Sequence, residues 1–316
     1  MVLAVRVAVV RLDALGDTLL STPALAALKA ARPEVEFRLF ASAVGAPILE
    51  PLGEVVVVPP DWSAGRLAAA IRAGQPQAVA VLTEKRRGLA AAFRSKAPMR
   101  LGFDPGRSQP LKAVWLRLAL THRMAYPNNL ELDPGLHEVE RYHRLLAPLG
   151  PLPGPGPLNL GRTFPRQPAG PVGLQLTPKW CLDDWSPQLV LTLLDRLPEP
   201  ALVLYGPGER EWAEQLLGEH PVQRAYHPDL MDYAAAVAGC SMLLTPDTGA
   251  AHVAAAVGTP VVDVFREAHH QHCVRRWRPW QVNHRVVLKP AFSPPALVKL
   301  VDEVSTALAE LSAECR

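Results

Sequence analysis

The stretch at residues 243–265 reads LLTPDTGAAHVAAAVGTPVVDVF. Residues 241–245 form an apolar run of strand length, and residues 261–265 form another. Between them, the small apolar residues 250–257 predict a short helix that can lie close against a sheet, and Gly258 followed by a proline ends it. The stretch therefore predicts strand, helix and strand in immediate succession, as in an α/β protein.

A polar turn precedes the predicted helix. Asp247, Thr248 and Gly249 supply a capping carboxylate, a hydroxyl and a permissive backbone at the helix start. Such a start presents unpaired N–H groups and a partial positive charge, which together favour an anion such as a diphosphate. His252, one turn into the helix, is expected to point at the same place. The local pattern leaves an ordinary helix cap and a core or surface histidine open as alternatives.

The composition is that of a soluble globular protein. The chain has 316 residues, enough for two domains, with 49% hydrophobic and 20% charged residues. A net charge of +3 does not by itself indicate nucleic acid, and no stretch approaches the length of a membrane-spanning helix, so any membrane contact is expected to be peripheral. The four cysteines have no paired spacing, which favours free thiols in a reducing cytoplasm over zinc or a redox motif.

The first half alternates between strand and helix patterns. Residues 5–12 predict a central parallel strand and residues 18–31 a helix, with Asp17 as its N-cap. The turn between them, at residues 13–17, has a single glycine, which disfavours an NAD-type oxidoreductase. The other elements predicted for this half are strands at 36–41, 55–58 and 77–82, and helices at Ala64–Ala73 and 138–149.

A Pro-Gly segment at residues 150–157 predicts a linker, and a second α/β unit follows it. Its predicted elements are strands at 171–176 and Ala201–Tyr205, a helix at 186–197 capped by Ser186, a helix at 209–217, and the stretch quoted first. An amphipathic helix at 297–311 ends the chain.

Between Lys85 and Arg123 there are ten basic residues and one acidic residue, Asp104. A solvated face is the ordinary explanation of such a run. A surface lined with these side chains would also attract an acidic acceptor or an anionic membrane.

Four segments of the chain resemble glycosyltransferase family 9, the ADP-heptose:lipopolysaccharide heptosyltransferases. They are RLDALGDTLLSTPALAALK at residues 11–29, HEVERY at 137–142, TPKW at 177–180 with Trp185, and DTGAAHVAAAVGTPVV at 247–262. The resemblance implies the GT-B architecture, in which two Rossmann-like doubly wound parallel-sheet domains face each other across a cleft. It implies an acceptor-binding domain at residues 1–160, a donor-binding domain at 161–292, and a C-terminal helix at 293–316 that packs back on the first domain.

The resemblance also implies the site residues. Asp17 falls on the family's catalytic carboxylate and is expected to act as the base. The expected donor contacts are Thr177, Lys179, Asp247, Thr248, Gly249 and His252. Glu209, in the Gly-Pro-Gly-Glu loop after a strand, is a candidate for the ribose hydroxyls, with an ordinary acid at a helix start as the alternative. No metal and no cofactor is expected.

Three departures from the family pattern lie on the donor side. Lys179 is directly followed by Trp180, with Cys181 in the place of a proline, so the lysine reaches the phosphates from a shifted position. Arg266 and Glu267 stand where the family has Gly-Pro, and Arg266 is either a new phosphate contact or a plug in the donor pocket. The run HHQHC at residues 269–273 and the RRWR at 275–278 are atypical, and the histidines are expected to be polar surface on a loop and not a metal site.

The sequence therefore predicts an inverting, metal-independent glycosyltransferase of the cytoplasm. Its expected partners are a nucleotide-diphosphate sugar donor and an anionic glycolipid or polysaccharide acceptor, with no nucleic acid, and the inner membrane surface is a further candidate contact. By resemblance the sugar is a heptose and the pathway lipopolysaccharide biosynthesis. The alternative is a non-catalytic nucleotide-binding protein that keeps the fold. If Asp17 is not the base, Asp13 is the next candidate.

Overall fold

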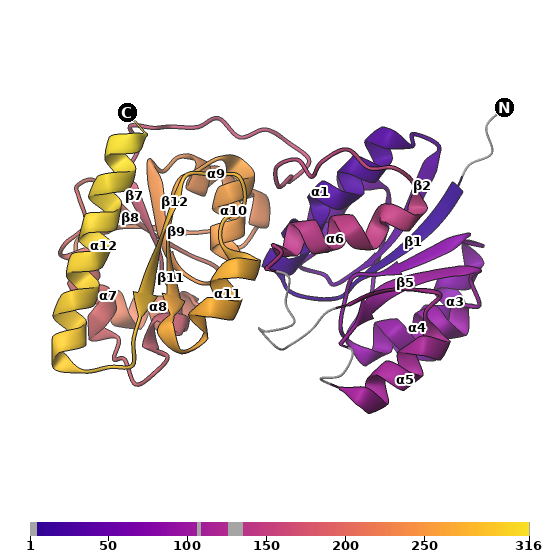
Figure 1. Cartoon of the computed structure of the whole chain (residues 1–316). Coiled ribbons are helices and arrows are strands. Elements are labelled where there is room, and N and C mark those ends of the chain that lie inside the picture. Colours follow the sequence, from indigo (N-terminus) through magenta and orange to yellow (C-terminus); the bar gives the residue numbers. More distant parts are fainter. Residues whose placement is uncertain (1–4, 106–108, 126–134, 316) are drawn as a thin grey trace. The chain divides into compact units, whose positions relative to one another are not determined.

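The computed structural model describes residues 5–105, 109–125 and 135–315. The chain divides into two compact α/β units, Met1–Gly161 and Arg162–Arg316 (Figure 1). The Pro-Gly segment stays with the first unit, because the Asn159 N–H that follows it donates to the Thr22 hydroxyl at 3.1 Å.

The first unit is built on a parallel sheet of six strands within its described residues, in the order β3-β2-β1-β4-β5-β6. The strands are β1 Val5–Arg11, β2 Val35–Ala41, β3 Glu54–Val57, β4 Ala78–Val81, β5 Met99–Asp104 and β6 His122–Ala125. The helices are α1 Leu15–Ala31, α2 Ala46–Leu49, α3 Ala64–Ala73, α4 Arg86–Ser95, α5 Pro110–Ala119 and α6 Glu138–Leu146, with 3-10 turns at Glu50–Leu52 and Ala147–Leu149.

The second unit repeats this plan in the part of residues 162–315 that the structure describes. Its parallel sheet has the order β12-β11-β10-β7-β8-β9. The strands are β7 Val172–Gln175, β8 Ala201–Tyr205, β9 Gln223–Tyr226, β10 Met242–Pro246, β11 Val261–Arg266 and β12 His284–Lys289. The helices are α7 Gln188–Leu194, α8 Arg210–Leu217, α9 Leu230–Ala238, α10 Gly249–Val257, α11 His270–Trp277 and α12 Pro294–Glu314, with 3-10 turns at Pro178–Cys181 and Glu267–His269.

Both sheets have the doubly wound strand order 3-2-1-4-5-6 when each unit's strands are numbered from its own start. The predicted fold class is confirmed. In this topology the strand order reverses between the first and fourth strands, which are β1 and β4 in one unit and β7 and β10 in the other. Ligands of open α/β sheets bind outside the carboxyl ends of the strands at this reversal. The topology therefore indicates one place in each unit where site residues should gather.

Three expected caps are wrong. Helix α1 begins at Leu15 with Ala14 as its N-cap, so Asp17 lies inside the first turn. Helix α10 is capped by Thr248, whose hydroxyl accepts from the Ala250 N–H, and not by Asp247. The expected cap of α7 at Ser186 is also wrong, because Pro187 holds that position. The end of α10 is as predicted, since Gly258 has the left-handed φ of 75° that glycine tolerates.

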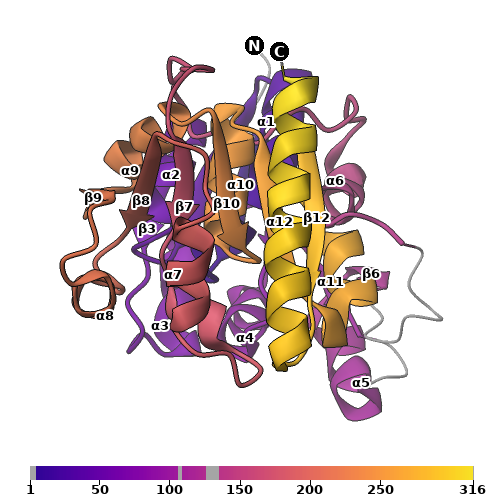
Figure 2. The same cartoon turned by 90° about the vertical axis from the view of Figure 1, so that its left-hand side faces the viewer.

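The C-terminal helix belongs to the second unit, and its packing on the first unit stays a prediction. The apolar face of α12, which includes Leu300, Val304 and Leu308, joins the core of the second unit with β-strand residues such as Val262 and Val287. Figure 2 shows α12 running along β12. Across residues 5–105, 109–125 and 135–315, no helix is both long and apolar enough to cross a bilayer.

Candidate functional site

The expected diphosphate corner lies at the strand reversal of the second unit. The Thr248 hydroxyl, which caps α10, donates to the side-chain oxygen of Gln175 at the end of β7, over 2.6 Å. The Thr245 hydroxyl, at the end of β10, donates to the same oxygen at 2.6 Å. One glutamine side chain thus joins two strand ends to the N-terminus of α10, which fixes the turn that would meet an anion.

Lys179 reaches this turn despite its shifted place in the sequence. It lies in the 3-10 turn Pro178–Cys181, whose N-cap is Thr177, a buried side chain that accepts from the Lys179 N–H at 3.5 Å. The Lys179 ammonium donates to the Asp247 carbonyl at 2.9 Å, and its side chain remains exposed. The structure therefore brings together five expected donor residues: Thr177, Lys179, Asp247, Thr248 and Gly249, the first residue of α10.

The turn that holds Lys179 is anchored by a residue that the sequence patterns did not single out. Lys289, at the end of β12, is buried and donates to the carbonyls of Trp180 and Leu182, while its ammonium lies 5.3 Å from the Trp185 ring centroid. Burial lowers the pKa of Lys289 to about 8. Lys289 stabilises the loop and is not free to contact a ligand.

The other two donor candidates, Glu209 and His252, have local structural roles. Glu209 precedes α8, and its carboxylate accepts from the Gly206 N–H at 3.3 Å, which closes the loop after β8. His252 is buried, with 4% of its surface exposed. Both positions agree with the plainer alternatives considered for these residues, an acid at a helix start and a core histidine, and a ligand contact by either stays a prediction.

Asp263 is a buried acid beneath the corner. It pairs across the sheet with Thr245, is fully buried, and neither carboxyl oxygen has a hydrogen-bond partner among the described residues. Burial, followed by the nearby charge of Asp247, raises the pKa of Asp263 well above its ordinary value, while Lys179 opposes the shift. Burial therefore favours the neutral, protonated form of Asp263 behind the turn.

Changing Asp263 to Asn is expected to remove a pH dependence of stability. Because its pKa is raised by folding, the folded chain keeps a proton that the unfolded chain releases above about pH 4. The wild type therefore loses stability as the pH rises through this window, by about 1.4 kcal/mol per pH unit relative to the variant. Urea unfolding at several pH values measures the difference. The exposed Asp302, also changed to Asn, is the control. Equal pH slopes for the wild type and Asp263→Asn would contradict the assignment.

The atypical residues after β11 have other partners. The Arg266 guanidinium forms two hydrogen bonds with the Asp183 carboxylate, one of 2.7 Å. Whether it also contacts a phosphate or fills part of the donor pocket stays a prediction. The histidine run, expected on a loop, lies in a 3-10 turn and α11, where a His272 ring nitrogen is 2.9 Å from Arg276. Within the described residues, no three His, Cys, Asp or Glu side chains gather as metal ligands would.

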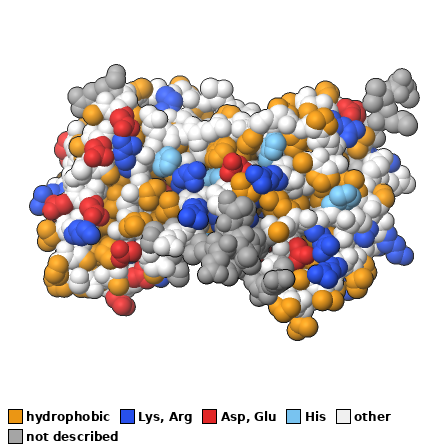
Figure 3. Space-filling model, viewed as in Figure 1, with side chains coloured by type: hydrophobic (Ala, Val, Ile, Leu, Met, Phe, Trp, Pro, Cys, Tyr) orange, Lys and Arg blue, Asp and Glu red, His pale blue; other side chains and the backbone are white. Residues whose placement is uncertain are grey.

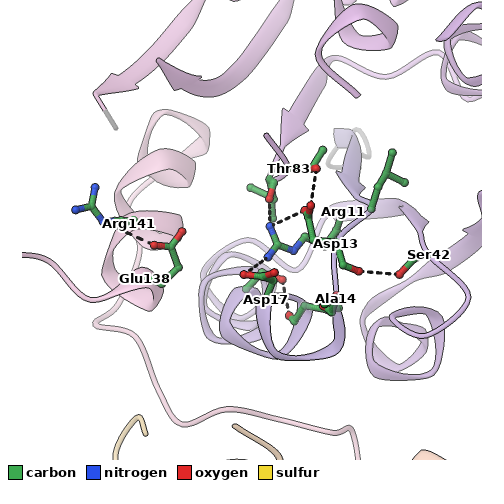
Figure 4. Close-up of polar contacts among 12 residues, drawn as sticks. Arg11, Asp13, Ala14, Asp17, Ser42, Thr83, Glu138 and Arg141 are labelled. Atoms are coloured by element: carbon green, nitrogen blue, oxygen red, sulfur yellow. Dashed lines mark hydrogen bonds and ion pairs between the residues drawn. The ribbon is translucent and has the colours of Figure 1, made fainter. Parts of the chain in front are cut away.

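The expected base lies at the strand reversal of the first unit. Asp17 is in the first turn of α1, and its carboxylate forms an ion pair of 3.4 Å with Arg11 at the end of β1 (Figure 4). The Asp17 side chain is 38% exposed, whereas that of Arg11 is 3% exposed. A carboxylate that is both held and open to solvent can meet a substrate hydroxyl.

Arg11 is held from several sides. Its guanidinium donates to the Leu82 carbonyl, forms a second ion pair with Asp13 at 3.3 Å, and lies 5.0 Å from the Tyr142 ring centroid. Burial opposes its charged form, but Tyr142 and the carboxylates of Asp17 and Asp13 raise the pKa of Arg11 above its ordinary value. Arg11 therefore remains a cation between two acids.

Asp13 is fixed more firmly than Asp17. Its carboxylate accepts from the Thr83 hydroxyl at 3.0 Å, and its carbonyl accepts from Ser42 at 2.9 Å. Thr83 follows β4 and packs on α4 at Gly88, where a Cβ would lie 2.7 Å from the Thr83 methyl carbon. The absence of a side chain at Gly88 lets α4 approach this strand end.

A third acid, Glu138, begins α6 and comes from the HEVERY segment. It is buried, with Arg141 at 3.8 Å. Burial raises the pKa of Glu138 to about 8, against the attraction of Arg141 and Arg11. Glu138 is therefore mostly neutral at pH 7. The positive charge of Arg11 is then compensated by the carboxylates of Asp13 and Asp17.

Comparison with known proteins finds a family match for part of the chain. Residues 203–303 match the family model described as glycosyltransferase family 9 (heptosyltransferase). No curated protein matches the chain in sequence.

Solved structures match nearly the whole chain in fold. A glycosyl transferase family 9 structure from Veillonella parvula has a TM-score of 0.76 at 19% identity, covering 99% of each chain. E. coli ADP-heptose lps heptosyltransferase II has a TM-score of 0.71 at 17% identity, covering 98% of this chain and 99% of its own. E. coli heptosyltransferase WaaC with ADP has a TM-score of 0.70 at 21% identity, covering 97% and 99%.

Two Rossmann-type units and these structural matches show the GT-B fold. Residues 203–303 are similar to glycosyltransferase family 9 (heptosyltransferase), which supports the predicted resemblance. The domain match and the fold support the predicted glycosyltransferase class.

Proposed function

We propose that the protein transfers a heptose from a nucleotide-diphosphate sugar to a hydroxyl of an anionic glycolipid or polysaccharide precursor, with inversion and without a metal. The observation that carries this proposal is the turn before α10. There the Lys179 ammonium contacts the Asp247 carbonyl and the Thr248 hydroxyl caps the helix. The second unit is then the donor unit, and the first unit, with Asp17, is the acceptor unit.

The turn before α10 would stabilise the departing diphosphate. As the bond between the sugar and the diphosphate breaks, negative charge grows on the leaving oxygen. Fixed N–H groups at the start of α10 and the Lys179 ammonium oppose this charge without having to reorganise. Asp263 and Asp247 do not offer the paired carboxylates that a divalent ion requires, because the Asp263 carboxyl is fully buried in the sheet. Lys179 thus takes the role that a metal would have.

Asp17 would act on the acceptor. The acceptor oxygen forms a bond to the anomeric carbon on the side opposite the leaving diphosphate, which inverts that centre, while its proton passes to the Asp17 carboxylate. Arg11 keeps this carboxylate in place. Asp17 then releases the proton to water, since its side chain is partly exposed.

A screen of nucleoside diphosphates tests the donor side. ADP is the first probe, because WaaC is solved with ADP and with ADP-2-deoxy-2-fluoro heptose. At about a hundred times its dissociation constant, a ligand of the folded state adds about 2.7 kcal/mol of stability and raises the melting temperature. We expect such a rise with at least one nucleoside diphosphate, unchanged by EDTA, and a much smaller rise in Thr248→Val.

Ser63→Ala is the matched control for this variant. Ser63 caps α3 as Thr248 caps α10, so both changes remove a cap worth about 1 kcal/mol. Only the change at Thr248 is expected to weaken nucleotide binding. The donor assignment fails if no nucleoside diphosphate shifts the melting temperature, or if Thr248→Val and Ser63→Ala bind equally well. Binding that requires Mg²⁺ or Mn²⁺ would contradict the metal-independent form of the proposal.

The alternative of a nucleotide-binding protein without turnover gives the same thermal shift. Turnover separates the two, because only an enzyme consumes the nucleotide sugar. Two features favour the enzyme: Lys179 at the turn before α10 and the ion pair of Asp17 with Arg11. A protein that only binds nucleotide would not need the Asp17 carboxylate beside Arg11.

A further inference from the structure

The loop that carries Lys179 continues into an unusual backbone conformation. Asp183 and Asp184 follow the 3-10 turn Pro178–Cys181 and have left-handed φ values of 63° and 65°. Residues with side chains adopt this conformation at an energetic cost, and ordinarily one at a time. Two in succession persist only where contacts from the surrounding structure outweigh that cost. Such contacts therefore fix the course of this loop.

The contacts come from the carboxyl ends of β11 and β12. The Arg266 guanidinium, at the end of β11, donates twice to the Asp183 carboxylate, and one of these hydrogen bonds is 2.7 Å long. The Phe292 N–H, which follows β12, donates to the Asp183 carbonyl at 3.1 Å. The Trp185 indole donates to the Pro290 carbonyl at 2.8 Å. Two strand ends thus hold the left-handed residues from both sides.

Lys289 holds the same loop closer to the 3-10 turn. Its buried ammonium donates to the Leu182 carbonyl at 2.5 Å and to the Trp180 carbonyl at 3.3 Å. The Asp183 carboxylate raises the pKa of Arg266 through its hydrogen bond, and it opposes the burial that lowers the pKa of Lys289. We call Asp183, Arg266 and Lys289 the loop clamp. It is one acid that stabilises two cations, and both cations bind the loop.

The loop clamp lies near the turn before α10. Cys273 of α11 reports this proximity: burial and the charge of Asp247 raise the pKa of its thiol, whereas Arg266 and Lys179 lower it. One side chain is therefore within electrostatic reach of the clamp, of Lys179 and of the turn. The Lys179 carbonyl also accepts from the Leu182 N–H at 3.3 Å. A shift of the clamped residues would thus be passed on to Lys179.

We propose that Arg266 and Lys289 are positioning residues: by holding Asp183 and the backbone before it, they keep Lys179 at the turn before α10. This inference rests on the proposed function, in which that turn meets the donor diphosphate. A cation that is already in place stabilises a departing diphosphate better than one that must first be ordered. Arg266 then contributes to donor binding without contacting the phosphates itself.

The affinity of the full chain for a nucleotide tests the proposal, with ADP as the probe in a calorimetric titration. Arg266→Met is expected to weaken ADP binding about tenfold, within the range of energies that couple residues of one network. In a chain that already carries Lys179→Met, the same change should have no further effect, because Arg266 acts through Lys179. Independent losses from the two changes would overturn the proposal.

Asp183→Asn separates positioning from a direct phosphate contact by Arg266. Asn tolerates the left-handed backbone but lacks the charge that holds the guanidinium. We expect ADP binding to weaken as in Arg266→Met. An Arg266 that contacted the phosphates itself would be released by this change, and binding would then stay the same or tighten. Asp184→Asn is the matched control and should bind ADP as the wild type does, because Asp184 has the same backbone conformation and an exposed side chain.

The position of the loop can also be measured without a ligand. Trypsin cleaves after Lys179 only when the loop opens locally, so mass spectrometry of a limited digest reports how firmly the loop is held. We expect this cleavage to be several-fold faster in Arg266→Met and in Lys289→Met than in the wild type. Melting temperatures check that each variant is folded.

Arg285→Met is the matched control for the loss of an arginine. Arg285 on β12 is 30% exposed, against 39% for Arg266, and it pairs with Glu310 and Glu314 of α12. Figure 3 shows blue and red side chains next to each other over α12. Because this pair does not bind the loop, Arg285→Met should keep the wild-type ADP affinity and the wild-type rate of cleavage after Lys179.

The proposal is overturned if Arg266→Met behaves like Arg285→Met in both measurements, or if Asp183→Asn leaves ADP binding unchanged. Normal ADP binding by the wild type together with either result would leave the proposed function intact. If the wild type binds no nucleoside diphosphate, the proposed function fails instead. The cleavage after Lys179 then decides alone whether Arg266 and Lys289 position this loop.

Discussion

Asp17→Asn is expected to lower turnover by a factor of about one hundred to ten thousand, the usual contribution of a positioned general base. Asn keeps the shape of Asp but cannot take the proton of the acceptor hydroxyl. The alternative of a capping role is removed by the structure, because the N-cap of α1 is Ala14. Loss of the partly exposed ion pair with Arg11 should cost only about 0–1 kcal/mol of stability. Turnover should therefore fall strongly, while nucleotide affinity and melting temperature stay close to those of the wild type.

Asp13→Asn is the matched control for this experiment. Asp13 shares Arg11 with Asp17 and also ends β1, but its carboxylate is held by Thr83. It is 19% exposed, half the value for Asp17. If Asp17→Asn turns over normally and Asp13→Asn does not, the base is Asp13. If both are normal, neither carboxylate is the base and the proposed mechanism is wrong.

The elements of the fold could be predicted because each has its own apolar pattern. Helix Ala64–Ala73 and strand Ala201–Tyr205 have the bounds expected from the sequence. The surface against which an apolar face packs could not be predicted in the same way. The stripe on α12 predicts that the helix is buried, but not against which unit, and the structure places Leu300 and Val304 in the core of the second unit. Helix α5 was not predicted from the sequence, and it exposes apolar residues such as Leu111 and Leu118.

Site residues could be predicted where they lie in a short turn with a recognisable sequence. Thr248 and Lys179 lie in segments that resemble signatures of the family, and both are found at the strand reversal. The residues that hold them come from distant strands. Gln175 and Lys289 gave no local signal, because their partners are 73 and more than 100 residues away. A lysine or aspartate inside an apolar strand, as at Lys289 and Asp263, is the sign that could have directed attention to them.

Arg11→Met is expected to destabilise the first unit by about 3 kcal/mol, the lower end for breaking a buried pair, because Asp13 and Asp17 keep some exposure to water. The change also leaves the Leu82 carbonyl without its donor. Arg38→Met is the control in the same sheet. Arg38 pairs with the exposed Glu54, so its loss should cost about 1 kcal/mol or less. Urea unfolding measures both. Equal losses would contradict the view that Arg11 organises the strand reversal.

Combining Arg11→Met with Asp17→Asn tests whether the two residues act as one unit in catalysis. If Arg11 acts on the reaction by holding the Asp17 carboxylate, Arg11→Met should lower turnover in the wild type and change little once Asp17 is Asn. Residues in direct contact commonly show such coupling, of about 0.5–3 kcal/mol. A purely structural role for Arg11 predicts instead that the two losses of turnover multiply. Their 3.4 Å ion pair leads us to expect coupling. Independent effects in folded variants would remove Arg11 from the mechanism and leave it a role in stability alone.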